Sequence, residues 1–114
     1  MESGAREYAG IEKLLETEPF IICPVHGDSM YPFINEDRDF VRLEKPHGVL
    51  ARYDLPLYRR PSGKLVLHRI IEVHRGYYVI CGDNRSFREN VPYDWVVAVS
   101  TGVIRDGRYI AADS

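Results

Sequence analysis

The order of hydrophobic and polar positions divides the chain into a short helical part and a longer part with the pattern of strands. Over residues 6–18, apolar side chains recur at three- and four-residue steps with charged side chains between them, which predicts one amphipathic helix. Pro19 ends it, because a proline ring blocks the continuation of a helix. From residue 20 onward, short apolar runs alternate with turn residues, a pattern typical of β-strands.

The second part predicts strands joined by tight turns. The predicted strands are residues 20–25, 40–43, 49–52, 55–58, 65–73, 77–81, 96–104 and 108–110, with hairpin turns at 60–63 and 106–107. The first strand is expected at a sheet edge, because Pro24 has no N–H to donate to a neighbouring strand. The run 65–73 is apolar on both faces and is therefore predicted to be buried over much of its length. The predicted fold class is all-β, as one domain over residues 1–114 in which residues 1–19 form an N-terminal helical segment.

Size and charge exclude several classes of function. A chain of 114 residues, 45% of them hydrophobic, can bury a core without staples. Its net charge of −2 predicts no nucleic-acid partner, since such partners require a basic face. No apolar run reaches the length of a signal peptide or a membrane span, so we expect a cytoplasmic protein without a membrane anchor.

The cysteine and histidine pattern gives no reason to expect a metal. Cys23 and Cys81 lie far apart in apolar runs, which predicts two buried reduced thiols and leaves one disulfide open. No CxxC spacing occurs and the four histidines are scattered. We therefore expect no metal site and no cofactor.

Ser29 is the first candidate for chemistry, because the residues around it predict a rigid turn. Gly27, two positions earlier, allows a tight backbone turn, and Pro32, three positions later, restricts the exit from it. Such a turn holds a hydroxyl in a fixed and exposed place, as a nucleophile requires. A plain surface turn has the same pattern, so this stretch does not decide between the two.

His68 and two acids are the other candidates. His68 lies inside the predicted strand 65–73, where it needs a partner because an unpaired buried polar group costs about 1–3 kcal/mol. A backbone carbonyl could be that partner. Asp83 stands in a Gly-Asp-Asn sequence that favours a β-turn, and Glu89 is a second acid in the same predicted loop. With Ser29, these residues could supply a nucleophile, a general base and a carboxylate that orients the imidazole. Their spacing leaves open whether they meet.

Several short motifs resemble the type I signal peptidase family and its relatives, the self-cleaving LexA and phage-repressor domains. Residues 27–32 are similar to the nucleophile box, 37–41 to the acidic turn and strand after it, 53–54 to a short Asp-containing loop, 67–70 to the His-Arg-Ile box and 81–84 to the Gly-Asp-Asn box. The similarity covers about residues 25–99, in the family's order.

The resemblance implies a role for each candidate. Ser29 would be the nucleophile and His68 the base, as in the archaeal and endoplasmic-reticulum branch, where histidine replaces the lysine of the bacterial enzymes. Asp83 would be the orienting acid, and Glu89 competes with it for that role. The resemblance also implies a coiled, mostly antiparallel β structure and a peptide or protein substrate that binds as an extended strand along a sheet edge.

The oxyanion site departs from the family's usual pattern. The bacterial enzymes often place a serine two positions before the nucleophile, where this chain has Gly27. Stabilisation of the oxyanion would then fall on backbone N–H groups such as that of Ser29. The substrate-binding and oxyanion segment is therefore expected to include Gly27, Asp28 and Met30.

Three alternatives remain at this stage. Lys64 precedes His68 by four residues on the same predicted strand face and could act as the base. The leading hypothesis, a soluble serine endopeptidase, competes with a non-catalytic peptide-binding or regulatory module that keeps the same fold. Self-cleavage is disfavoured, because the Ala9-Gly10 bond lies within the predicted helix.

Overall fold

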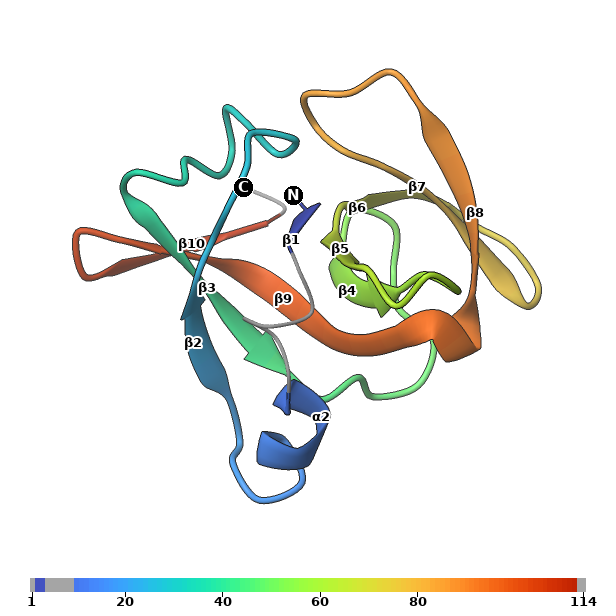
Figure 1. Ribbon diagram of the computed structural model, residues 1–114, viewed down its shortest axis with the longest axis horizontal. Helices are drawn as coiled ribbons and strands as arrows, with labels where there is room; N and C mark the ends of the chain where they lie inside the picture. Colours follow the sequence, from blue (N-terminus) through green and yellow to red (C-terminus); the bar gives the residue numbers. More distant parts are fainter. Residues whose placement is uncertain (1, 4–9, 113–114) are drawn as a thin grey trace.

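The chain folds into two antiparallel sheets, which the computed structural model describes for residues 2–3 and 10–112 (Figure 1). The larger sheet has the order β1 (Glu2–Ser3), β5 (Leu65–Leu67), β4 (Leu55–Arg59), β9 (Val96–Arg105), β3 (Asp39–Glu44) and β2 (Ile21–Pro24), and β10 (Arg108–Ala111) also pairs with β9. The smaller sheet has the order β6 (Arg69–Val73), β7 (Tyr77–Cys81) and β8 (Arg88–Pro92). A 3₁₀ helix, η1 (Tyr93–Trp95), joins β8 to β9. The all-β prediction is confirmed, and so is the edge position of β2.

The N-terminal helix is much shorter than predicted. Helix α2 covers Ile11–Leu14, and residues 6–9 of the prediction lie outside the described part of the chain. Gly10 stands directly before α2 with a φ of 84°, a left-handed conformation that a right-handed helix cannot run through. Ile11 and Leu15 are buried and Leu14 is half exposed, so this turn of helix closes one end of the core.

One strand prediction was wrong and strand β8 was missed, both for local reasons. Residues 49–52 form no strand, because the Asp54 carboxylate accepts the Ala51 N–H at 2.8 Å and the Asp54 N–H bonds back to the Ala51 carbonyl at 3.1 Å. This is a side-chain-stabilised turn. Strand β8 was not predicted, because its sequence is mostly polar and only Val91 in it is buried.

The predicted strand 65–73 is in fact two strands in two sheets. Strand β5 pairs with β4 in the larger sheet, and β6 pairs with β7 in the smaller one. His68 stands between them, outside both ladders. Both faces of β5 are buried, because Leu65 and Leu67 pack in the larger core cluster and Val66 packs in a second core cluster, which Ile70 of β6 also joins. The run is therefore apolar on both faces where it passes between two cores, and the end of β6 is not buried.

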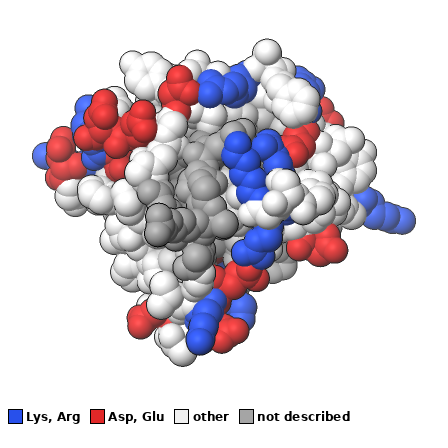
Figure 2. Space-filling view, viewed as in Figure 1, with Lys and Arg blue, Asp and Glu red and all other residues white. Residues whose placement is uncertain are grey.

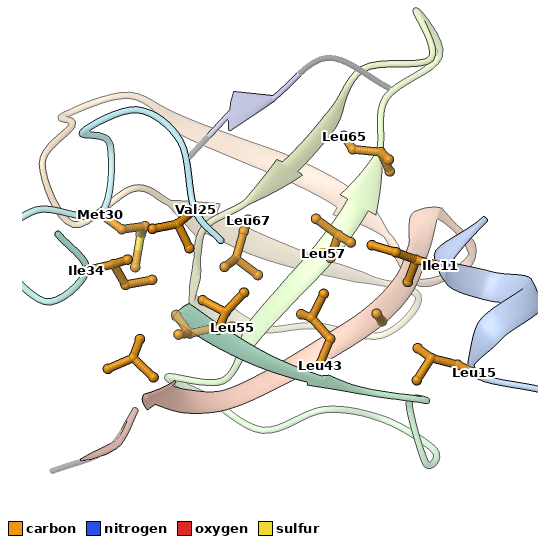
Figure 3. Close-up of a cluster of buried hydrophobic side chains, with 13 residues drawn as sticks. Ile11, Leu15, Val25, Met30, Ile34, Leu43, Leu55, Leu57, Leu65 and Leu67 are labelled. Carbon is orange, nitrogen blue, oxygen red and sulfur yellow. The ribbon is translucent and has the colours of Figure 1, made fainter. Parts of the chain in front are cut away.

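The larger core cluster reaches from the Ser29 loop to helix α2. Thirteen of the described residues are buried in it, among them Leu43, Leu55 and Leu57 from the larger sheet. Figure 3 shows Met30 at one end of this cluster and Leu15 at the other. The loop that carries Ser29 is thus anchored through its neighbour Met30, whose side chain is fully buried.

An ion pair holds the same loop from its other end. The two oxygens of the buried Asp39 accept hydrogen bonds from Arg105 Nε at 2.8 Å and Nη2 at 2.6 Å. Arg105 Nη2 also donates to the Phe33 carbonyl at 2.9 Å. The hydrogen bond from Arg105 lowers the pKa of Asp39 below its ordinary value. The chain between residues 33 and 39 is therefore tied to the end of β9.

Cys23 and Cys81 are free thiols, and both are half buried, less than the full burial predicted. Acidic and basic side chains are interspersed over the face shown in Figure 2. Within the described residues, no helix has both the length and the apolar character needed to cross a bilayer.

Candidate active site

The candidate residues lie in three connections that converge on one place. Ser29 is in the segment between β2 and β3, and His68 is the single residue between β5 and β6. Gly82 and Asp83 begin the loop between β7 and β8. Residues 14 to 54 positions apart in sequence are therefore brought together where the chain passes between its strands.

Ser29 and His68 are in direct contact. His68 Nε2 lies 3.0 Å from Ser29 Oγ, which is hydrogen-bond distance. Ser29 is 2% exposed and His68 is 7% exposed. The prediction of an exposed hydroxyl was therefore wrong, because Met30 draws this loop into the core.

The Gly-Asp-Asn loop is hydrogen-bonded to the backbone around Ser29. The Asn84 N–H donates to the Ser29 carbonyl at 2.7 Å, and Asn84 Nδ2 donates to the Asp28 carbonyl at 3.1 Å. The Asp83 N–H donates to Met30 Sδ at 3.3 Å. A Cβ atom on Gly82 would lie 2.7 Å from the Ser29 carbonyl oxygen, so only glycine allows this approach.

Asp28 points to the same loop. Its Oδ1 is 2.6 Å from Arg85 Nη2, and that hydrogen bond lowers the pKa of Asp28. Both groups are largely exposed, so the pair contributes little to stability. It adds one more link between the nucleophile loop and the loop after β7.

The side chain of Asp83 is bound to an arginine. Its Oδ1 and Oδ2 accept from Arg69 Nε and Nη2, both at 2.8 Å. Arg69 Nη1 continues to the carbonyls of Tyr53 at 3.1 Å and Ala112 at 2.7 Å. Asp83 therefore joins the Gly-Asp-Asn loop to β6 and to the end of the described chain.

Glu89 lies on a strand and not in the loop where it was predicted, and it reaches the site through a tyrosine. In β8, its carboxylate accepts from Arg60 Nε at 3.1 Å and Arg60 Nη2 at 3.0 Å. The Tyr58 hydroxyl donates to Glu89 Oε1 at 2.8 Å, and the Tyr58 oxygen lies 3.5 Å from His68 Nδ1. Burial and the neighbouring Glu89 raise the pKa of Tyr58, so the phenol keeps its proton.

Sequence reasoning missed Tyr58. It stands in an apolar strand with the register Tyr58↔Val66 to β5, so its ring looked like ordinary core. The only available signal was the 60–63 hairpin, which predicts that 55–58 and 65–67 lie side by side. That signal places the tyrosine near the histidine, but it does not indicate what the hydroxyl contacts.

The backbone around Ser29 offers two donors. The Gly27 N–H is engaged, since it donates to Glu36 Oε2 at 2.8 Å. Within the described part of the chain, the N–H groups of Ser29 and Met30 have no hydrogen-bond acceptor. Two consecutive N–H groups beside a nucleophile are the kind of donors that stabilise an oxyanion.

The other candidate groups lie away from this centre. Lys64 closes the hairpin turn by accepting the Arg60 N–H at its carbonyl, at 2.9 Å, and β5 separates it from His68. Among residues 2–3 and 10–112, no group of three metal-ligating side chains is close enough together to hold an ion. Comparisons with protein-family models, with curated proteins and with solved structures found no match to this chain.

Proposed function

We propose that this chain is a serine endopeptidase in which Ser29 is the nucleophile and His68 the general base. The observation that carries the proposal is the 3.0 Å contact between Ser29 Oγ and His68 Nε2. A serine hydroxyl becomes an effective nucleophile only when a base removes its proton. The two N–H groups at Ser29 and Met30 supply the second requirement, stabilisation of the developing oxyanion.

The reaction proceeds in two halves. Ser29 Oγ attacks the peptide carbonyl carbon while its proton passes to His68 Nε2. The C–N bond then breaks, and the same proton moves from Nε2 to the leaving amine, which leaves an acyl ester on Ser29. A water molecule attacks the ester, His68 takes its proton, and return of that proton to Ser29 Oγ releases the acid.

The substrate class follows from the strand edges beside the site. Strand β2 is an edge strand that leads into the Ser29 segment, while β5, which ends at the residue before His68, is covered on its outer side by β1. An extended peptide that adds to such an edge forms main-chain hydrogen bonds along it and presents one carbonyl near its end. The substrate is thus an extended segment of a peptide or protein.

The test is covalent labelling, which requires no knowledge of the substrate. A small fluorophosphonate transfers its phosphonyl group to an activated serine with loss of fluoride, and intact-mass spectrometry counts the adducts. We expect one adduct on the wild type and none on Ser29→Ala. For His68→Ala we expect labelling about 100-fold slower or more, since general-base catalysis contributes about 10²–10⁴-fold.

Ser62→Ala is the matched control, because Ser62 is an exposed serine in the 60–63 hairpin. It should be labelled at the wild-type rate. Equal labelling of wild type and Ser29→Ala would show that Ser29 is not the nucleophile. A wild type that takes up no adduct, yet binds extended peptides, would favour the non-catalytic module.

A further inference from the structure

We infer that Tyr58 is a positioning residue for His68: its hydroxyl stands between the imidazole and Glu89, and it holds the ring in the tautomer that a general base needs. The inference rests on the proposed function for its catalytic meaning. Its structural content is independent of that function, because it concerns which nitrogen of His68 carries the proton.

The proton assignment follows from what each group can donate. The Glu89 carboxylate is held by two hydrogen bonds from Arg60, and an ionised carboxylate can only accept. The Tyr58 hydroxyl has one proton and donates it to Glu89 Oε1 at 2.8 Å. Towards His68 the phenol oxygen can therefore only accept, so the proton of the neutral imidazole lies on Nδ1. Nε2 is then unprotonated, and it is the nitrogen that lies 3.0 Å from Ser29 Oγ.

The packing around the phenol restricts it to this arrangement. Tyr58 is fully buried in the second core cluster. Its ring meets the His68 ring edge to face, with centroids 6.4 Å apart and planes at 70°. The 3.5 Å between Tyr58 Oη and His68 Nδ1 is long, as catalytic hydrogen bonds often are before a substrate binds. It shortens when His68 becomes an imidazolium and its Nδ1–H donates more strongly.

The same geometry separates the two acids that the sequence left in competition. Both Asp83 oxygens bond to Arg69, on the side of the Gly-Asp-Asn loop. Glu89 acts on the imidazole through Tyr58, and Arg60 fixes it there. Asp83 therefore fixes the loop that is hydrogen-bonded to the Ser29 backbone, and the Tyr58–Glu89 pair orients the base.

The experiment measures the His68 tautomer directly. Long-range ¹H–¹⁵N spectra of histidine-labelled protein distinguish a protonated from an unprotonated ring nitrogen. We expect the neutral His68 of the wild type to carry its proton on Nδ1, and Tyr58→Phe to move population toward the Nε2–H form. In peptide cleavage, Tyr58→Phe should lower kcat about 10-fold with KM unchanged, a part of the general-base contribution.

Tyr78→Phe is the matched control. Tyr78, in β7 of the smaller sheet, is also buried, and its hydroxyl accepts the Leu50 N–H at 2.8 Å. This variant loses a buried hydroxyl of the same kind and should leave the His68 tautomer unchanged. A loss of packing or stability alone would affect both variants alike.

The outcomes separate this inference from the proposed function. A wild-type His68 with its proton on Nε2 overturns the inference without any variant, even if Tyr58→Phe fails to fold. An unchanged tautomer and kcat in folded Tyr58→Phe also overturn it, while labelling of Ser29 still supports the peptidase. The expected tautomers with no labelling of the wild type would support the positioning role and reject the catalytic function.

Discussion

Gly82→Ala perturbs the site through a single methyl group. A Cβ atom at this position would lie 2.7 Å from the Ser29 carbonyl oxygen and 3.2 Å from His68 Cδ2. The Ser29 carbonyl cannot turn aside freely, because it also accepts the Asn84 N–H at 2.7 Å. The added methyl group therefore pushes the backbone of the Ser29 loop away from the loop after β7.

The size of the effect can be worked from the contact. Carbon–oxygen contacts lie at about 3.3 Å or more, so the two atoms must separate by roughly 0.6 Å. Forcing an extra methyl group into packed structure costs about 1–3 kcal/mol. Misplacing reacting groups by about 1 Å costs about 100-fold in rate, so we expect Ser29 to react about 10-fold more slowly in Gly82→Ala.

Two assays on the same variants check this reasoning. Urea unfolding gives the change in the free energy of unfolding, and the second-order rate of fluorophosphonate labelling gives the reactivity of Ser29. Gly63→Ala is the control: Gly63 has a φ of +91° and open space around it. Alanine is strained there by about 1–2 kcal/mol, but far from Ser29, so its labelling rate should stay at the wild-type value. Wild-type reactivity in Gly82→Ala would refute the close approach of Gly82 to Ser29.

Three further predictions concern the ion pair between Arg105 and Asp39 and the N-terminal strand β1. Arg105→Ala removes two charged hydrogen bonds from the buried Asp39 carboxylate and leaves it with the half-exposed Arg38, whose Nε lies 3.6 Å from Oδ1. We expect the free energy of unfolding in urea to fall by about 3 kcal/mol; a loss below about 1 kcal/mol would contradict this. Because the pKa of Asp39 is lowered from 3.8, its contribution to stability is complete above that pH and is lost as the pH falls through the folded value. Asp39→Asn should therefore lose less stability than the wild type on acidification from about pH 4 to pH 2. Strand β1 pairs with Leu65 and Val66 of β5, just before His68. Deleting residues 2–9 should free the outer edge of β5 and lower KM for an extended peptide. An unchanged KM would mean that the substrate uses another edge.

Much of the strand pattern could be predicted from sequence because it depends on neighbours in the chain. Short apolar runs bounded by turn residues place β3, β7 and β9, and Pro24 places β2 at an edge. The residue types at Ser29 and His68 also indicate their chemistry without a structure, since few side chains can act as a nucleophile and a base. These features need only local hydrogen bonding and the intrinsic reactivity of each group.

The partners of these residues depend on the tertiary structure. The sequence shows 65–73 as one apolar run, and only the packing of two sheets breaks it at His68. Asp83 and Glu89 look equivalent in sequence, but Asp83 binds Arg69 in β6, whereas Glu89 binds Arg60 in the turn after β4. Ser29 looks like a surface residue until Met30 anchors its loop in the core.

By itself, then, the sequence determined most of the strands and which side chains have the reactivity of a nucleophile or a base, because both depend on residues within a few positions of each other. The tertiary structure alone decided that the Ser29 loop is buried, that Gly82 approaches it, and that Tyr58 stands between His68 and Glu89. Those contacts join residues 10 to 53 positions apart. They exist only through the pairing and packing of distant strands, which local patterns do not encode.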